Sequence, residues 1–221
     1  MAANPIRPGV PKKSPTEQVE IQRQFRDTER RTVLDAAVAG TGHVLFVDAA
    51  HFVFGTDLCC LWSILRVRIR AASGRQRFNV LGAWNAVTRQ RLAVTDTTVV
   101  NTETMGALLR TIAAQQWVGP VTVVRDNPRY QRNKVVQGLA VELGIRLLFL
   151  PSYSPNLNLF ERLWGFAKRT AVSGQYHPDF ASFQVANEDT LAGIPAKHAA
   201  KLASLMTLEC QTFENVSLLA A

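Results

Sequence analysis

Short apolar runs alternate with amphipathic segments along most of the chain, and this pattern predicts a mixed α/β domain. Runs rich in β-branched and aromatic residues predict strands, and apolar residues that recur three or four positions apart predict helices. The expected strands are 43–54, 78–87, 91–99, 121–126 and 145–151. The expected helices are 14–39, 101–117, 131–143, 157–171, 179–192 and 196–208. Residues 57–77 form a variable, basic stretch.

The order of these elements predicts how the strands pair. Three successive strands favour an antiparallel meander, and the strand–helix alternation that follows favours right-handed crossovers to parallel strands. We therefore expect a five-stranded mixed sheet, three antiparallel strands and then two parallel ones, flanked by helices. Ser14, Pro15 and Glu17 are suited to the start of the first helix, and Gly40 to its end. Because this helix is highly charged, we expect residues 1–40 to form an arm and a linker helix, only partly packed on a domain at 41–221.

Composition narrows the class of protein. Apolar residues make up 47% of the 221 residues and charged residues 19%, so a sizeable core is possible. No apolar run reaches the roughly 18 residues of a membrane-spanning helix, and the N-terminus is not of signal-peptide type, so we expect a cytoplasmic protein without a membrane partner. The three cysteines are odd in number and contain no C-x-x-C pair, which supports neither a disulfide framework nor a zinc site.

The positive charge of the chain points to a class of partner. Lysine and arginine total 25 against 17 acidic residues, a net charge of +8, and the excess is concentrated between residues 36 and 150. A basic domain favours a polyanionic partner such as nucleic acid. Ordinary solvated surface charge is the alternative interpretation.

Three acidic residues lie at positions of the predicted fold that suit a ligand-binding site. Asp48 interrupts an apolar strand, Asp126 closes another strand, and Glu161 lies in the first turns of a helix. Ligands of open α/β sheets gather at the carboxyl ends of strands, and carboxylates that converge there suit Mg²⁺ or Mn²⁺. Each acid also has a simpler interpretation: a hydrogen-bonded buried acid for Asp48, a turn residue for Asp126, and a partner of the helix dipole for Glu161.

The segments around the second and third acids carry a resemblance to a known family. VVRDNPRYQRN and LPSYSPNLNLFERLW resemble the catalytic core of DDE transposases, specifically the insertion-sequence-630 group of the mariner superfamily. The matching positions are Asp126, Asn127, Leu150 to Pro155, Leu157, Asn158, Glu161 and Trp164, and 34 residues separate Asp126 from Glu161. Pro128, Gln131, Asn156 and Leu159 depart from the family pattern. The first 40 residues are too few for the helix-turn-helix domains that members of this group usually carry.

The resemblance implies an RNase H-like catalytic domain over residues 41–221. In it, Asp48, Asp126 and Glu161 are the catalytic residues and bind two Mg²⁺ or Mn²⁺ ions, which clamp the oxygens of an in-line phosphoryl displacement. Water would hydrolyse the strand at the end of the element, and the freed 3′-hydroxyl would attack target DNA. Asn127 would orient Asp126 from outside the metal shell, or would simply form a turn.

The resemblance also implies double-stranded DNA, both element ends and target, as the partner, and a homodimer associated with the nucleoid. Basic residues near the acids are the expected phosphate contacts. They are Arg66, Arg68, Arg70, Arg75, Arg77, Arg129, Arg132, Lys134, Lys168 and Arg169. A charged guard on an exposed strand edge is the alternative for the first five. His51 is three positions from Asp48, so on a strand it points to the opposite face, and we interpret it as structural.

Three functions are compatible with these residues. The first is a cut-and-paste transposase that both cleaves DNA and transfers the strand. The second is an RNase H-like nuclease that cleaves without strand transfer. The third is a decayed or domesticated remnant that binds DNA without catalysis. The Y-S-P-x-L-N segment favours the first, and the presence of all three acids argues against the third.

Overall fold

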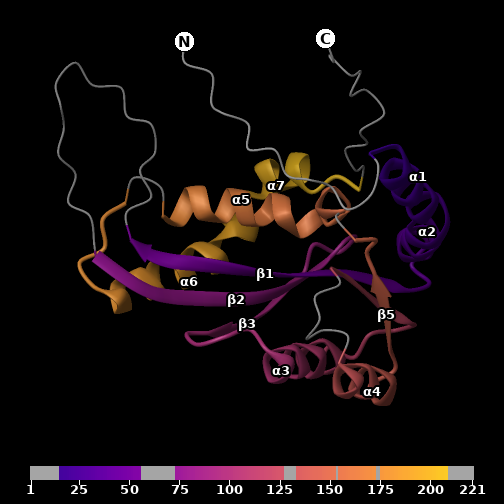
Figure 1. Ribbon diagram of the computed structural model, residues 1–221, viewed down its shortest axis with the longest axis horizontal. Coiled ribbons are helices and arrows are strands. Elements are labelled where there is room, and N and C mark those ends of the chain that lie inside the picture. Colours follow the sequence, from indigo (N-terminus) through magenta and orange to yellow (C-terminus); the bar gives the residue numbers. More distant parts are fainter. Residues whose placement is uncertain (1–14, 56–72, 127–132, 153, 173–174, 209–221) are drawn as a thin grey trace, which may run out of the picture.

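The fold was analysed in a computed structural model of the protein, which describes residues 15–55, 73–126, 133–152, 154–172 and 175–208. A single five-stranded sheet forms its centre (Figure 1). The strands are β1 (His43–Gly55), β2 (Ser73–Asn85), β3 (Arg91–Asp96), β4 (Val121–Arg125) and β5 (Ile145–Phe149). They lie in the order β3-β2-β1-β4-β5, with β1, β2 and β3 antiparallel and with β4 and β5 parallel to β1. The predicted mixed sheet is therefore confirmed.

Helices cover both faces of this sheet. Figure 1 shows α5 (Leu159–Ala171) and α7 (Ala199–Leu205) on one side of β1, and α3 (Thr102–Ala113) and α4 (Lys134–Glu142) on the other. Even-numbered residues of β1 join the core cluster that contains α5, α6 (Phe180–Lys197) and α7. Odd-numbered residues of its first half join the cluster that contains α3 and α4. The period-two alternation of a strand thus decides which helical layer each side chain meets.

β2 begins five residues earlier than the sequence predicted. Its first residues, Ser73–Arg77, pair with the end of β1 across a register shift between Val53 and Gly55. The stretch SGRQR is polar and shows no apolar alternation, so its own sequence contains no strand signal. Pairing with the long β1 strand supplies the hydrogen bonds that extend it.

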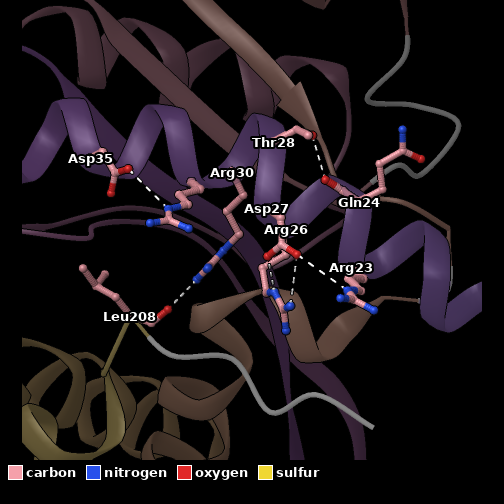
Figure 2. Close-up of polar contacts among 9 residues, drawn as sticks. Arg23, Gln24, Arg26, Asp27, Thr28, Arg30, Asp35 and Leu208 are labelled. Carbon is pink, nitrogen blue, oxygen red and sulfur yellow. Dashed lines mark hydrogen bonds and ion pairs between the residues drawn. The ribbon is translucent and has the colours of Figure 1, made fainter. Parts of the chain in front are cut away.

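The N-terminal helix is continuous, as predicted, but its middle is wound differently. Between α1 (Pro15–Phe25) and α2 (Arg31–Val38), residues Arg26–Arg30 form one π-helical stretch. Arg30 in this stretch is buried, and its Nη2 donates to the carbonyl oxygen of Leu208 at 2.9 Å (Figure 2). Its guanidinium also lies 5.6 Å from the centre of the Phe46 ring.

This helix contributes to the core of the domain. Phe25, Val33, Leu34 and Ala37 are buried in the same cluster as the even-numbered face of β1. Its packing is thus more extensive than the charged sequence indicated, because the apolar residues are few but lie on one face. A domain boundary at residue 40 stays a prediction. Within the described part of the chain, no helix is long and apolar enough to cross a membrane.

Candidate active site

Asp48 lies where the pairing of β1 changes. Val47 pairs with Arg125, the last residue of β4, so Asp48 and Asp126 directly follow paired residues on neighbouring parallel strands. Such strands run about 4.8 Å apart. The end of β4 therefore places Asp126 beside Asp48, as expected for acids at the carboxyl end of a parallel strand.

Glu161 reaches the same region from α5. The N-cap of this helix is Asn158, whose side-chain oxygen accepts a hydrogen bond from the backbone N–H of Phe160 at 3.1 Å. Glu161 follows in the first turn, as the sequence predicted. Phe160 and Trp164 are buried against the sheet, whereas Glu161 lies on the exposed side of the helix.

The three carboxylates share one electrostatic environment. The pKa of Asp48 is raised from its ordinary value of 3.8 to about 7, chiefly by burial and in smaller part by the negative charges of Asp126 and Glu161. Against them, the backbone N–H of Ala49, 2.9 Å from Asp48 Oδ1, and the positive charge of Lys168 lower this pKa. Burial also raises the pKa of Asp126. The pKa of Glu161 is raised by burial and by the charge of Asp126.

The chemistry of this donor set fits a hard divalent cation. All three side chains offer oxygen ligands, and burial disfavours the charged form of each, so that its pKa is raised. Among the described residues, however, no group of three or more His, Cys, Asp or Glu side chains is gathered tightly enough to hold a metal ion. The acids are thus within electrostatic reach of one another without forming a closed coordination shell.

The predicted phosphate contacts are distributed over several elements. Arg77 on β2, Lys134 at the start of α4, and Lys168 and Arg169 near the end of α5 are exposed. Lys134 lies in the helical layer opposite to α5, so these four do not form one face. Arg75 lies on β2, but its side chain is outside the described part of the structure. Asn127, Arg66, Arg68, Arg70, Arg129 and Arg132 also lie outside the described residues.

His51 points away from the acids, as the sequence predicted. Its Nδ1 lies 2.6 Å from Oδ1 of Asn79, and Nδ2 of Asn79 donates to the carbonyl oxygen of Thr98 at 3.0 Å. Since the amide of Asn79 uses its nitrogen toward Thr98, its oxygen is the acceptor and His51 Nδ1 the donor. These hydrogen bonds connect β1, β2 and the segment after β3, so His51 has a structural role in the sheet.

Sequence reasoning gave no role to two residues that shape the site, Asn158 and Gly82. Asn158 belongs to the family motif, and an Asn just before an apolar helical segment is also a signal for an N-cap. Gly82 on β2 pairs with Asp48, and a Cβ there would lie 2.5 Å from Cζ of Phe160. A glycine inside an apolar strand can indicate such a close approach.

Comparison with known proteins places the chain in a family. A family model described as DDE superfamily endonuclease matches residues 43–184. A comparison with curated proteins found no match.

Several solved structures share the fold. The Mos1 mariner paired end complex with Mn aligns with a TM-score of 0.62 and 12% identity, over 93% of this chain and 67% of that one. The Mos1 strand transfer complex aligns with a TM-score of 0.60 and 13% identity, over 93% and 67%. The catalytic domain of Mos1 mariner transposase aligns with a TM-score of 0.54 and 13% identity, over 90% and 98%. At these identities the likeness establishes the RNase H-like fold alone. The family match covers more than half of the sequence, and the chain therefore belongs to the DDE superfamily endonuclease family.

Proposed function

We propose that this chain is the catalytic domain of a cut-and-paste DNA transposase of the insertion-sequence-630 group of the mariner superfamily. One observation carries the proposal: in a chain of the DDE family, Asp48, Asp126 and Glu161 lie within electrostatic reach of one another at the end of β4. The sequence motif around Asp126 and Glu161 supports the narrower assignment to this group.

The proposed reaction is phosphoryl transfer on DNA. Two Mg²⁺ or Mn²⁺ ions, when bound, would supply an activated water and stabilise the charge that develops on the phosphate oxygens. Asp48, Asp126 and Glu161 would hold these ions through carboxylate oxygens. Asp48 is half-buried between β4 and α5, so its environment excludes part of the bulk water and strengthens its interaction with a cation. Since a freed 3′-hydroxyl serves as the second nucleophile, no covalent protein–DNA intermediate is required.

The protein would contact DNA through basic side chains around these acids. Lys168 is the best placed of the described ones, because its charge acts on Asp48. We propose that Lys168, Arg169, Arg77 and Lys134 contact phosphates. We propose the same role for Arg66, Arg68, Arg70, Arg75, Arg129 and Arg132. Asn127 would orient Asp126. We further propose a homodimer on paired DNA ends, and residues 1–40 as the arm and linker helix of a catalytic domain over 41–221.

Cleavage of supercoiled plasmid tests the catalytic part of the proposal. Wild type should nick the plasmid in the presence of Mn²⁺ or Mg²⁺, and Asp126→Asn and Glu161→Gln should not. Asp96→Asn is a matched control, because the Asp96 carboxylate lies at the end of β3, where Oδ1 accepts a hydrogen bond from the hydroxyl of Thr98. Equal nicking by wild type and Asp126→Asn would contradict the proposal.

A strand-transfer assay tests the narrower proposal, that the chain acts as a transposase. A pre-cut duplex with a free 3′-hydroxyl should be joined to target plasmid by wild type and not by Asp126→Asn. Nicking without joining would instead support a nuclease. If wild type neither nicks plasmid nor binds Mn²⁺ in a calorimetric titration with DNA present, the chain is a non-catalytic remnant.

A further inference from the structure

Asn158 makes hydrogen bonds in two directions. Its Oδ1 accepts from the N–H of Phe160 at 3.1 Å, which caps α5. Its Nδ2 donates to the carbonyl oxygen of Val47 at 3.4 Å. The residue is only 1% exposed. One buried amide thus connects the turn of α5 that carries Glu161 to the β1 residue directly before Asp48.

Gly82 lies on the sheet side of the contact between α5 and the central strands. This glycine pairs with Asp48 across β1 and β2, and the rings of Phe160 and Trp164 occupy the space above it. A Cβ at this position would lie 2.5 Å from Cζ of Phe160 and 3.2 Å from Cζ2 of Trp164. A separation below 3.0 Å requires the rings to shift, and Phe160 is the neighbour of Glu161 in the chain.

From these contacts we propose that Asn158 is a positioning residue for the carboxylate site. It fixes the first turn of α5 on β1 and so holds Glu161 in a defined position relative to Asp48, while Gly82 leaves the space for this approach. The inference rests on the proposed function, since the position of Glu161 matters only if the three acids act together. Asn158 itself contacts no reacting group.

A helix cap alone does not account for these contacts. Asn133 caps α4 through its Oδ1, which accepts from the N–H of Val135 at 3.0 Å, but Asn133 is exposed. Its Nδ2 reaches a side-chain hydroxyl, that of Thr102, at 3.4 Å. In Asn158 the corresponding Nδ2 is buried and donates to the backbone carbonyl oxygen of Val47 on the central strand β1. Asn133 is therefore a matched control with the same capping function, on the opposite helical layer.

The first experiment separates capping from positioning. Asn158→Ser keeps an oxygen that can cap α5 but removes the amide donor to Val47, and Asn158→Ala removes both. Mn²⁺ affinity, measured by calorimetry, should weaken at least about tenfold in both variants, in line with other residues that orient metal ligands. The melting temperature should fall more in Asn158→Ala than in Asn158→Ser. Asn133→Ser should leave Mn²⁺ affinity within about twofold of wild type, since only groups that orient the ligands carry such losses.

A second variant changes the contact between α5 and the sheet at a residue of β2. Gly82→Ala should displace Phe160 and weaken Mn²⁺ binding in the same direction as Asn158→Ser. Gly165→Ala is the control on the same helix, because a Cβ at Gly165 meets no atom within 4 Å. This control should bind Mn²⁺ as wild type does.

Crystal structures of wild type and Asn158→Ser without metal provide a readout that does not depend on the reaction. We expect the first turn of α5 and Glu161 to move away from Asp48 by about 1 Å, a displacement large enough to impair a preorganised site. An unmoved Glu161, or wild-type Mn²⁺ affinity in Asn158→Ser, overturns the positioning role. If wild type itself binds no Mn²⁺, the proposed function fails, and the structures alone decide whether Asn158 holds Glu161 in place.

Discussion

The two halves of β1 differ in their surroundings although they form one strand. Residues 45–47 pair with β2 on one edge, residues 43–47 pair with β4 on the other, and residues 44–47 are all buried. From Asp48 onward, within the described part of the chain, only β2 pairs with the strand. There the even-numbered residues Ala50, Phe52 and Phe54 are buried, whereas His51 and Val53 are exposed.

The difference between the two halves of β1 shows how a strand of a buried sheet can carry a carboxylate that is accessible from solvent. β4 ends at Arg125, so one neighbour of β1 is lost directly after Val47. Asp48 occupies this junction and is half-buried, so that burial, with the charges of Asp126 and Glu161, raises its pKa to about 7 while part of its surface stays open. One residue earlier a carboxylate would be enclosed on both edges of the strand. At this junction the carboxylate of Asp48 is partly desolvated and is still accessible from solvent.

The largest expected effect comes from neutralising the acid at this junction. Asp48→Asn keeps the shape of the side chain but removes a charged metal ligand. We expect metal-dependent plasmid nicking to fall by about 1000-fold or more, since a loss of several kcal/mol of charge stabilisation corresponds to tenfold per 1.4 kcal/mol. Activity within tenfold of wild type would show that Asp48 is not a ligand.

The same substitution should change how stability depends on pH. Since the pKa of Asp48 is about 7 in the folded state and 3.8 ordinarily, the folded protein holds the proton more tightly. The free energy of unfolding should therefore decrease as pH rises from about 4 through 7, by on the order of a few kcal/mol. Asp126 and Glu161 act in the same direction, because their pKa values are also raised.

Urea unfolding in EDTA at pH 5 and pH 8 measures this effect. Asp48→Asn should flatten the pH dependence and be more stable than wild type at pH 8. Asp96→Asn provides the comparison, because the pKa of Asp96 is lowered by hydrogen bonds from Thr98 rather than raised by burial. Parallel pH profiles for wild type and Asp48→Asn would refute the assignment.

Two valines on β1 allow the halves to be compared directly. Val47 in the first half is 1% exposed and Val53 in the second half is 50% exposed, although both occupy odd-numbered positions. Val47→Ala should lower the free energy of unfolding by about 2 kcal/mol, through lost burial and a cavity, whereas Val53→Ala should change it by less than about 0.5 kcal/mol. Equal losses in urea unfolding would mean that the two halves are equally enclosed.

The smallest effect on metal binding is expected at His51, three residues from Asp48 but on the opposite face. His51→Ala removes one hydrogen bond to Asn79 and should lower stability by about 1 kcal/mol. Mn²⁺ affinity should stay unchanged, because the imidazole does not face the acids. A tenfold loss of Mn²⁺ affinity in calorimetry would instead assign His51 to the site.

Most elements of the fold follow from local sequence patterns. The apolar strand of β1, the alternation of strands and helices after residue 100, and Glu161 in the first turn of α5 were each predicted, because burial periodicity and capping residues act locally. The first residues of β2 were not, since a polar segment pairs only when a long partner strand is already present. Arg30, in the π-helical stretch Arg26–Arg30, is buried in contact with two residues far away in the sequence, Phe46 and Leu208.

The order of the strands and helices follows from patterns within the sequence, which also singles out Asp48, Asp126 and Glu161 as candidate metal ligands. Three contacts are visible only in the folded chain: β4 ends beside Asp48, the amide of Asn158 donates to the carbonyl oxygen of Val47, and Phe160 packs over Gly82. The two sets of features differ in the range of the interactions behind them. Periodicity and capping act over a few residues, whereas register, close packing and the coupling of carboxylates join residues far apart in the chain.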